Sequence, residues 1–201
     1  MAMRILLVGA TGRLGAVVGR TLTERGHDLV TVGRGGGDVR CDITDPEALD
    51  ALWARVGSVD AVVSAAGDVA YAPFEELERA AYVRSFEGKV LAQIDLVRTG
   101  LAHVAPNGSF TLITGVLSRD PIATGAAAAM ANGAVEAFVR AAAREIAPRR
   151  INVVSPSVFT ESLVEYGSLF PGYESVDLAD VARAYVKSVE GAATGEVIEL
   201  P

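Results

Sequence analysis

Short apolar runs alternate with helix-forming segments along the whole chain, and this alternation restricts the fold more than any other feature of the sequence. Runs of five or six apolar residues are typical of strands that are buried on both faces, and each intervening segment is long enough to cross back over a sheet. The pattern predicts an α/β fold with a mostly parallel sheet and helices on both faces. The expected strands cover residues 4–8, 28–32, 39–43, 59–64, 109–114, 151–155 and 196–200.

Helix boundaries are marked by residues that favour helix ends. Gly26 stands where a glycine ends the helix expected at 14–25. Asp45-Pro46-Glu47 is typical of a helix start, with the aspartate as N-cap. The other expected helices are a stretch at 74–103 that bends near Gly88, a helix at 124–145 and one that begins at Asp177.

The chain shows no linker, repeat or domain boundary. Its 201 residues suit a single domain, so we expect one unit over residues 1–201. The one shift in composition is a stretch rich in Gly, Pro, Ser and aromatic residues at 155–176. We interpret it as a substrate-side loop or flap.

Composition argues against several classes of function. A net charge of −7 without a Lys/Arg block disfavours binding to nucleic acid or an anionic membrane. The lone cysteine, Cys41, has no disulfide partner, and no Cys/His cluster has metal-ligand spacing. The apolar run near the N-terminus lacks a signal-peptide pattern, and no apolar segment reaches the length of a membrane span. We therefore expect a cytoplasmic protein without a metal site.

A glycine-rich loop joins the first expected strand to the first expected helix. The loop reads GATGRLG. Backbone amides at a helix N-terminus bind a pyrophosphate, and glycines let it approach closely, so this position favours dinucleotide binding over an ordinary turn. The candidate residues are Gly9, Thr11, Gly12, Arg13, Leu14 and Gly15.

The end of the second expected strand bears on the choice of coenzyme. An acid there accepts the ribose hydroxyls of NAD(H), whereas an arginine pairs the 2′-phosphate of NADP(H). Here the chain has Arg34, and we expect Arg34 and Arg13 to converge on one phosphate. NADP(H) is therefore favoured over NAD(H), and Asp38 is interpreted as a loop residue.

These features, together with four further motifs, resemble the short-chain dehydrogenase/reductase family over nearly the whole chain. The motifs are CDITD, SAAG, RINVVSPSVFTES and the final TGEVIEL, although Arg13 occupies the family's usual middle glycine. The resemblance implies a Rossmann-type, doubly wound sheet of about seven strands. It also implies a coenzyme site, with Asp42 and Ile43 beside the adenine, Ala65, Ala66 and Gly67 after the fourth strand, and Pro156, Val158 and Thr160 near the nicotinamide.

The catalytic positions of that family are changed here. The family uses a tyrosine and, four residues later on the same helix, a lysine that lowers the tyrosine pKa. In this chain those positions fall at Ala128 and Asn132, the family's serine falls near Gly115, and its helix asparagine falls near Lys89. The resemblance is therefore to a divergent branch that lacks the usual Tyr and Lys.

Three residues are the candidates for replacing that centre. Asn132 is expected to hold a ribose hydroxyl. Lys89 either supplies the missing positive charge or a proton, or is an ordinary solvated helix lysine. Ser118 either orients a carbonyl group or caps a loop. Four tyrosines near the expected cleft are interpreted mainly as packing residues, with proton delivery as the alternative: Tyr71, Tyr82, Tyr166 and Tyr173.

The helix at 124–145 also carries Glu136 and Arg140, whose i,i+4 spacing predicts a favourable ion pair. The family resemblance implies packing of this helix in a homodimer or homotetramer. The leading hypothesis is an NADP(H)-dependent oxidoreductase acting on a small carbonyl or alcohol substrate. The alternative is a non-catalytic NADP(H)-binding sensor or assembly module, and a third hypothesis is elimination or isomerisation on the same fold.

Overall fold

Seven parallel strands form one sheet in the computed structural model, which describes residues 1–201. The order β3-β2-β1-β4-β5-β6-β7 runs outward from β1 in both directions, so the sheet is doubly wound, as the sequence predicts. The strands are β1 (Arg4–Val8), β2 (Asp28–Gly33), β3 (Val39–Arg40), β4 (Val59–Ser64), β5 (Val104–Ile113), β6 (Arg150–Ser155) and β7 (Val197–Glu199).

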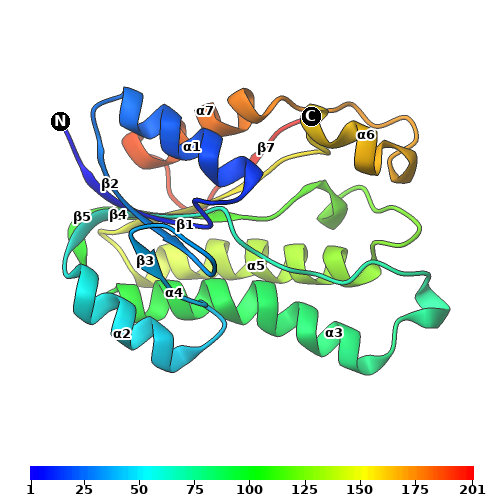
Figure 1. Ribbon diagram of the computed structural model, residues 1–201, viewed down its shortest axis with the longest axis horizontal. Coiled ribbons are helices and arrows are strands. Elements are labelled where there is room, and N and C mark those ends of the chain that lie inside the picture. Colours follow the sequence, from blue (N-terminus) through cyan, green and yellow to red (C-terminus); the bar gives the residue numbers. More distant parts are fainter.

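Helices cover both faces of this sheet (Figure 1), with α1 and α7 on one face and α2, α4 and α5 on the other. Their bounds are α1 (Arg13–Glu24), α2 (Pro46–Val56), α3 (Arg79–Ser85), α4 (Ala92–Gly100), α5 (Ala126–Glu145), α6 (Leu163–Tyr166) and α7 (Leu178–Glu190). None of these helices is both long enough and apolar enough to cross a membrane.

Each face of the sheet has its own hydrophobic core. Along β1, Ile5 and Leu7 belong to the core under α1 and α7, whereas Leu6 and Val8 belong to the opposite core. Successive strand residues point to opposite faces, so a strand covered on both sides is mostly apolar along its length, and a buried polar residue such as Asn152 needs hydrogen-bond partners inside the protein. The uninterrupted apolar runs in the sequence have this origin.

The helix ends confirm two sequence predictions and change a third. The side chain of Asp45 accepts a hydrogen bond of 3.0 Å from the Glu47 amide and caps α2. Gly26 follows α1 with a positive φ of 86°. At the start of α7, the Leu178 amide donates to the Glu161 carboxylate (3.1 and 3.2 Å), and the Asp177 side chain makes no capping bond.

Three element boundaries differ from the sequence predictions. The predicted third strand shortens to two residues, and β5 starts five residues earlier than expected, at Val104. The long helical stretch divides into a 3₁₀ turn (Phe74–Glu76), α3, a π-helical segment (Phe86–Leu91) and α4. The interruption of the helix expected near Gly88 is present, as a π-helical segment that contains this glycine.

Candidate active site

Two adjoining cavities lie at the carboxyl ends of the strands. The smaller cavity, of about 410 Å³, is bordered by the ends of β1, β2 and β4. The larger cavity, of about 730 Å³, is bordered by the ends of β5 and β6 and by residues of segment 155–176. Gly67 and Asp68 line both cavities. The two cavities therefore meet near the point where the strand order reverses, between β1 and β4. Open α/β sheets bind ligands at this point.

The loop between β1 and α1 forms one wall of the smaller cavity. Gly9 has a φ of 81°, and a Cβ there would lie 2.8 Å from the carbonyl group of Ala65. A Cβ on Gly15 would lie 2.0 Å from the Gly9 oxygen, so this glycine allows α1 to pack directly on the loop. Gly12, the N-cap of α1, makes no side-chain cap, and the first turn has no acidic residue. Free amides and the helix dipole thus make this end of α1 favourable for an anion.

The opposite wall of the smaller cavity contains Arg34 and Asp42. Asp42 accepts bonds from the amide and hydroxyl of Thr44 (3.1 and 2.9 Å), and these bonds together with nearby Arg34 hold the pKa of Asp42 below its ordinary value. Arg34 is exposed and forms no ion pair within 4.0 Å. Asp38 accepts from the amide and hydroxyl of Thr31 (2.8 and 2.6 Å), as expected for a loop residue.

The expectation that Arg13 and Arg34 converge on one phosphate is wrong. Nη1 of Arg13 donates to Oγ of Ser162 at 2.7 Å, and Nη2 lies 3.5 Å from the Glu165 carboxylate. Arg13 lines the larger cavity and Arg34 the smaller one. The reason is that segment 155–176 provides a hydroxyl and a carboxylate for Arg13, a long-range contact that the local sequence does not reveal.

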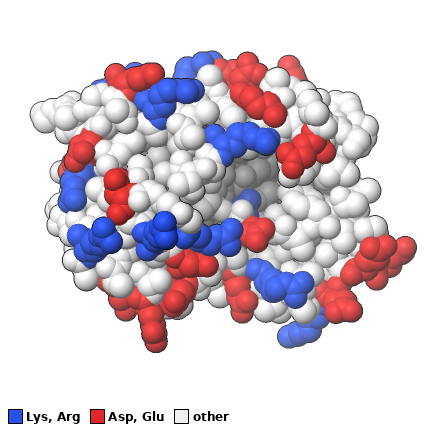
Figure 2. Space-filling model, viewed as in Figure 1, with Lys and Arg blue, Asp and Glu red and all other residues white.

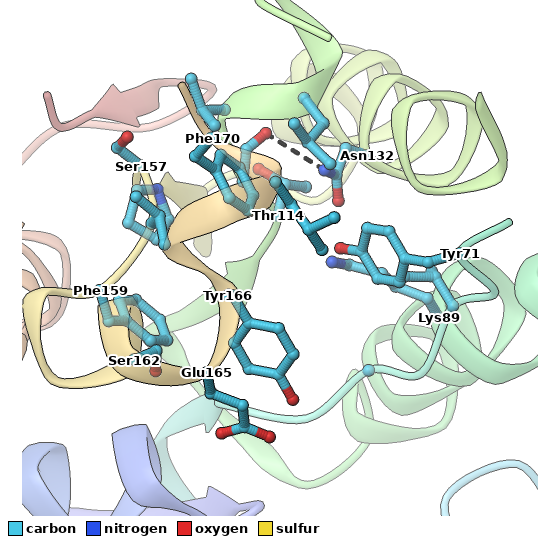
Figure 3. Close-up of a pocket in the computed structure, with 18 of the residues that line it drawn as sticks. Tyr71, Lys89, Thr114, Asn132, Ser157, Phe159, Ser162, Glu165, Tyr166 and Phe170 are labelled. Atoms are coloured by element: carbon cyan, nitrogen blue, oxygen red, sulfur yellow. Dashed lines mark hydrogen bonds between the residues drawn. The ribbon is translucent and has the colours of Figure 1, made fainter. Parts of the chain in front are cut away.

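Lys89 enters the larger cavity from the π-helical segment. Its aliphatic stem crosses Gly67, where an added Cβ would lie 2.9 Å from Cγ of Lys89. The amine forms no ion pair within 4.0 Å and no hydrogen bond with the protein. Burial lowers the pKa of Lys89 to about 8, and the negative charge of Glu136 partly opposes this effect. Figure 3 shows Lys89 and Tyr71 on the same side of the cavity. The reading of Lys89 as an ordinary solvated lysine does not describe this environment.

Asn132 lies on α5, is 3% exposed and lines the same cavity. Its Nδ2 donates to the Gly115 carbonyl at 3.2 Å, drawn as a dashed line in Figure 3. Its Oδ1 is buried without a hydrogen-bond partner. Because buried acceptors are nearly always paired, this atom is a natural contact for a bound hydroxyl group.

Behind these residues, Glu136 forms a buried hydrogen-bond cluster that corrects a sequence prediction. This residue is 8% exposed, and its Oε1 accepts from the hydroxyls of Thr114 (3.0 Å), Ser118 (2.8 Å) and Ser155 (3.2 Å). The ion pair with Arg140 is absent, because three hydroxyls, two from the residues after β5 and one from β6, hold the Glu136 carboxylate inside. Ser118 points to Glu136 and does not line either cavity.

Most of the other sequence candidates gather around the two cavities. The smaller cavity is lined by Gly9, Thr11, Gly12, Arg34, Asp42, Ile43, Ala65, Ala66 and Gly67, and the larger by Arg13, Gly67, Lys89, Asn132, Pro156 and Val158. Besides Ser118, three candidates line neither cavity. Leu14 is in the core under α1, Gly15 packs on Gly9, and Thr160 donates to Ser175 at 3.1 Å.

Sequence reasoning missed several residues of the larger cavity. Thr114 follows β5 directly and Ser157 stands two residues after the end of β6, and their places after strands could have identified them. The remaining missed residues carry no such signal: Asp68, Val69, Val116, Leu117, Phe159, Ser162, Leu169 and Phe170. Of the four tyrosines, Tyr71 and Tyr166 line this cavity, whereas Tyr173 donates to the Asp120 carbonyl and the Tyr82 hydroxyl is buried without a partner.

The molecular surface around the site carries both signs of charge. Figure 2 shows a hollow in the middle of this face, with acidic and basic groups interspersed around it. No large region of a single charge surrounds the hollow. The surface therefore gives no strong preference for a highly charged macromolecule.

Comparisons with known proteins agree with this architecture. The family model described as enoyl-(acyl carrier protein) reductase matches residues 13–189. The structure of the protein lin1944 from Listeria innocua is 45% identical, with a TM-score of 0.96, over 98% of this chain and 99% of that chain. A small-chain dehydrogenase in complex with NADPH is 24% identical, with a TM-score of 0.87, over 99% of this chain and 96% of that chain. L-xylulose reductase from Homo sapiens is 27% identical over an alignment of 178 residues that covers 80% of this chain and 73% of the relative.

Proposed function

Because the chain belongs to the short-chain dehydrogenase/reductase family, we propose that it is an NADP(H)-dependent oxidoreductase acting on a small carbonyl or alcohol at an atypical active site. One observation carries the proposal. The Lys89 amine and Asn132 Oδ1 both lack a protein partner, and both belong to the cavity that adjoins the glycine-rich loop. Such unpaired polar groups in a cleft are typical of a binding or catalytic site.

The smaller cavity fits a dinucleotide. The uncapped N-terminus of α1 suits the pyrophosphate, and the glycines leave room for it. Arg34 is free to pair a 2′-phosphate, which favours NADP(H) over NAD(H). The complex of a small-chain dehydrogenase of the same fold with NADPH is consistent with this assignment.

At the reacting end, the coenzyme would supply hydride transfer. Lys89 would donate a proton to the carbonyl oxygen during reduction and accept it during oxidation. A pKa of about 8 leaves the amine mostly protonated at neutral pH while keeping it a competent acid. Asn132 would hold a ribose hydroxyl through Oδ1, and Ser118 would act at a distance, through the Glu136 carboxylate that its hydroxyl contacts.

This centre differs from the family pattern at the tyrosine position. Ala128 is 1% exposed and packs in a small apolar cluster with Val116 and Leu117. No acid can act from there. The buried alanine at this position also supports the second candidate function, a non-catalytic NADP(H)-binding sensor or assembly module.

Coenzyme titration by calorimetry tests the binding half of the proposal. We expect Arg34→Ala to lower the affinity for NADPH at least about tenfold, because a charge-assisted contact with the 2′-phosphate is lost. The affinity for NADH should change little. Arg20→Ala, at an exposed position on α1, is the matched control. An equal loss of affinity for NADPH and for NADH would contradict the assignment of Arg34 to the 2′-phosphate.

Isotope transfer separates the two candidate functions. Deuterium that passes from labelled NADPH to a carbonyl compound identifies an oxidoreductase. Tight coenzyme binding without transfer to any carbonyl compound in a broad panel favours the sensor.

We also propose a homodimer or homotetramer. Large apolar side chains are exposed on the helical layer that contains α3, the π-helical segment and α5: Val83, Phe86, Leu91 and Met130. Burial of such side chains is the usual driving force for subunit association. Light scattering on the purified protein tests this, and a monomeric mass at micromolar concentration would refute it.

A further inference from the structure

The walls of the larger cavity are mostly apolar, and four of the lining side chains are aromatic. Tyr71 stands on the side of Lys89, while Phe159, Tyr166 and Phe170 belong to segment 155–176 (Figure 3). Aliphatic side chains complete the wall: Val69, Val116, Leu117, Val158 and Leu169. Such a surface stabilises an apolar ligand body, and its rings favour an aromatic one.

Five of the polar side chains of this cavity are already bonded within the protein. Ser157 donates to the Glu174 carbonyl at 2.7 Å, and Ser162 accepts from Arg13 at 2.7 Å. Arg13 also pairs with Glu165, and the Thr114 hydroxyl donates to Glu136. A ligand with several hydroxyl groups would have to break these bonds or leave its own hydroxyls unpaired, and either outcome costs binding free energy.

The remaining polar side-chain groups of the cavity have no hydrogen-bond partner in the protein. The Lys89 amine and Asn132 Oδ1 face the interior, and Asp68 lies where the smaller cavity begins. The Tyr71 and Tyr166 hydroxyls belong to side chains that are 51% and 44% exposed. The cavity therefore offers one carbonyl oxygen a position at the Lys89 amine, and its only other unbonded hydroxyls are those of the two partly exposed tyrosines.

Formal charges along the lining balance. Arg13 and Lys89 are opposed by Asp68 and Glu165. An anionic ligand gains no net attraction from this set. We infer that the substrate is an uncharged carbonyl compound with an aromatic body and a single polar group, and not a sugar or another polyol; the inference rests on the proposed function.

Equilibrium binding to the protein saturated with NADP⁺ tests the inference without turnover. The probes are 4-phenyl-2-butanone, L-xylulose and 2-oxo-4-phenylbutanoate, which represent an aromatic ketone, a polyol ketone and an aromatic keto acid. Calorimetry on the wild-type chain should give the aromatic ketone at least about tenfold higher affinity than L-xylulose, and no lower affinity than the keto acid.

The results separate this inference from the proposed function. Binding of NADP⁺ is measured first on the same protein, and its absence would remove the proposed function. If NADP⁺ binds but L-xylulose binds as tightly as the aromatic ketone, or if no probe binds, the aromatic substrate class is refuted while the coenzyme site stands. If the keto acid binds about tenfold tighter than the ketone, the uncharged class is refuted.

A matched pair of variants locates the binding surface. Phe170→Ser removes a ring from the cavity and should lower the affinity for the aromatic ketone about tenfold. An unchanged affinity for NADP⁺ would show that this variant is folded. Phe74→Ser changes a ring that is 75% exposed and outside the cavity, and should leave affinity for the ketone unaltered. Equal affinity of both variants for the ketone would contradict the inference.

Discussion

The ionisation of Lys89 gives the sharpest test of the site, because it can be measured without knowing the substrate. The chain contains only two lysines, Lys89 and Lys187, and Lys187 is exposed on α7. Reductive methylation with ¹³C-formaldehyde therefore labels two side chains and the N-terminal amine. In NMR spectra recorded against pH, the Lys89 resonance should have its midpoint near the pKa of about 8 that burial imposes, and not near the ordinary value of 10.5.

The same pKa difference predicts how stability depends on pH. Between about pH 8 and 10.5 the unfolded chain keeps the proton that folded Lys89 has released. The unfolded state thus binds more protons, and the free energy of unfolding rises with pH across this window. The difference between 10.5 and about 8 corresponds to about 3 kcal/mol as an upper limit, at ~1.4 kcal/mol per pKa unit.

Replacing the amine isolates this contribution. Below about pH 8 the wild type bears the full cost of the buried charge, so Lys89→Met should be more stable at pH 7 by up to about 3 kcal/mol. The advantage should shrink as the pH approaches 10.5. Urea denaturation at a series of pH values measures it, and Lys187→Met is the control. A Lys89 midpoint at 10.5, or a constant difference between wild type and Lys89→Met, would refute the description of the site.

Three further perturbations test the scaffold by thermal and urea denaturation. Gly15→Ala should prevent folding or cost several kcal/mol, because its Cβ would lie 2.0 Å from a backbone oxygen. By contrast, a Cβ added at Gly133 on α5 would have no neighbour within 4 Å, so Gly133→Ala should raise the free energy of unfolding by about 0.5–1 kcal/mol. Glu136→Ala should cost about 2–4 kcal/mol by leaving buried hydroxyls without their charged acceptor, whereas Arg140→Ala should stay within about 0.5 kcal/mol. Asp45→Ala removes the cap of α2 and should cost about 1 kcal/mol, and no loss would show that the cap is dispensable.

Much of the fold follows from local sequence. A strand buried on both faces is mostly apolar, so β1, β4 and β6 are visible as largely apolar runs, and their alternation with helices predicts the parallel sheet. Helix ends such as those at Asp45 and Gly26 each depend on a single residue, so they can also be predicted from local sequence.

The site could be predicted only in part, because its decisive contacts join distant segments. Glu136 is buried by hydroxyls contributed by β6 and by the residues after β5, and Arg13 is held by Ser162, 149 residues away. The resemblance to a known family placed Asn132 and Lys89 in the cleft. It could not reveal which of their polar atoms lack partners, since that depends on every neighbouring group.

The π-helical segment Phe86–Leu91 affects how this site can change during evolution. A π-helical turn is equivalent to one extra residue in an α-helix, and one residue rotates the following chain by about 100°. Deleting a single codon in this segment would allow α-helical pairing to resume and would change the position of Lys89 relative to at least one flanking helix. The amine of Lys89 can therefore be gained or lost from the cavity by one insertion or deletion, a shorter path than the several substitutions needed to rebuild a catalytic centre.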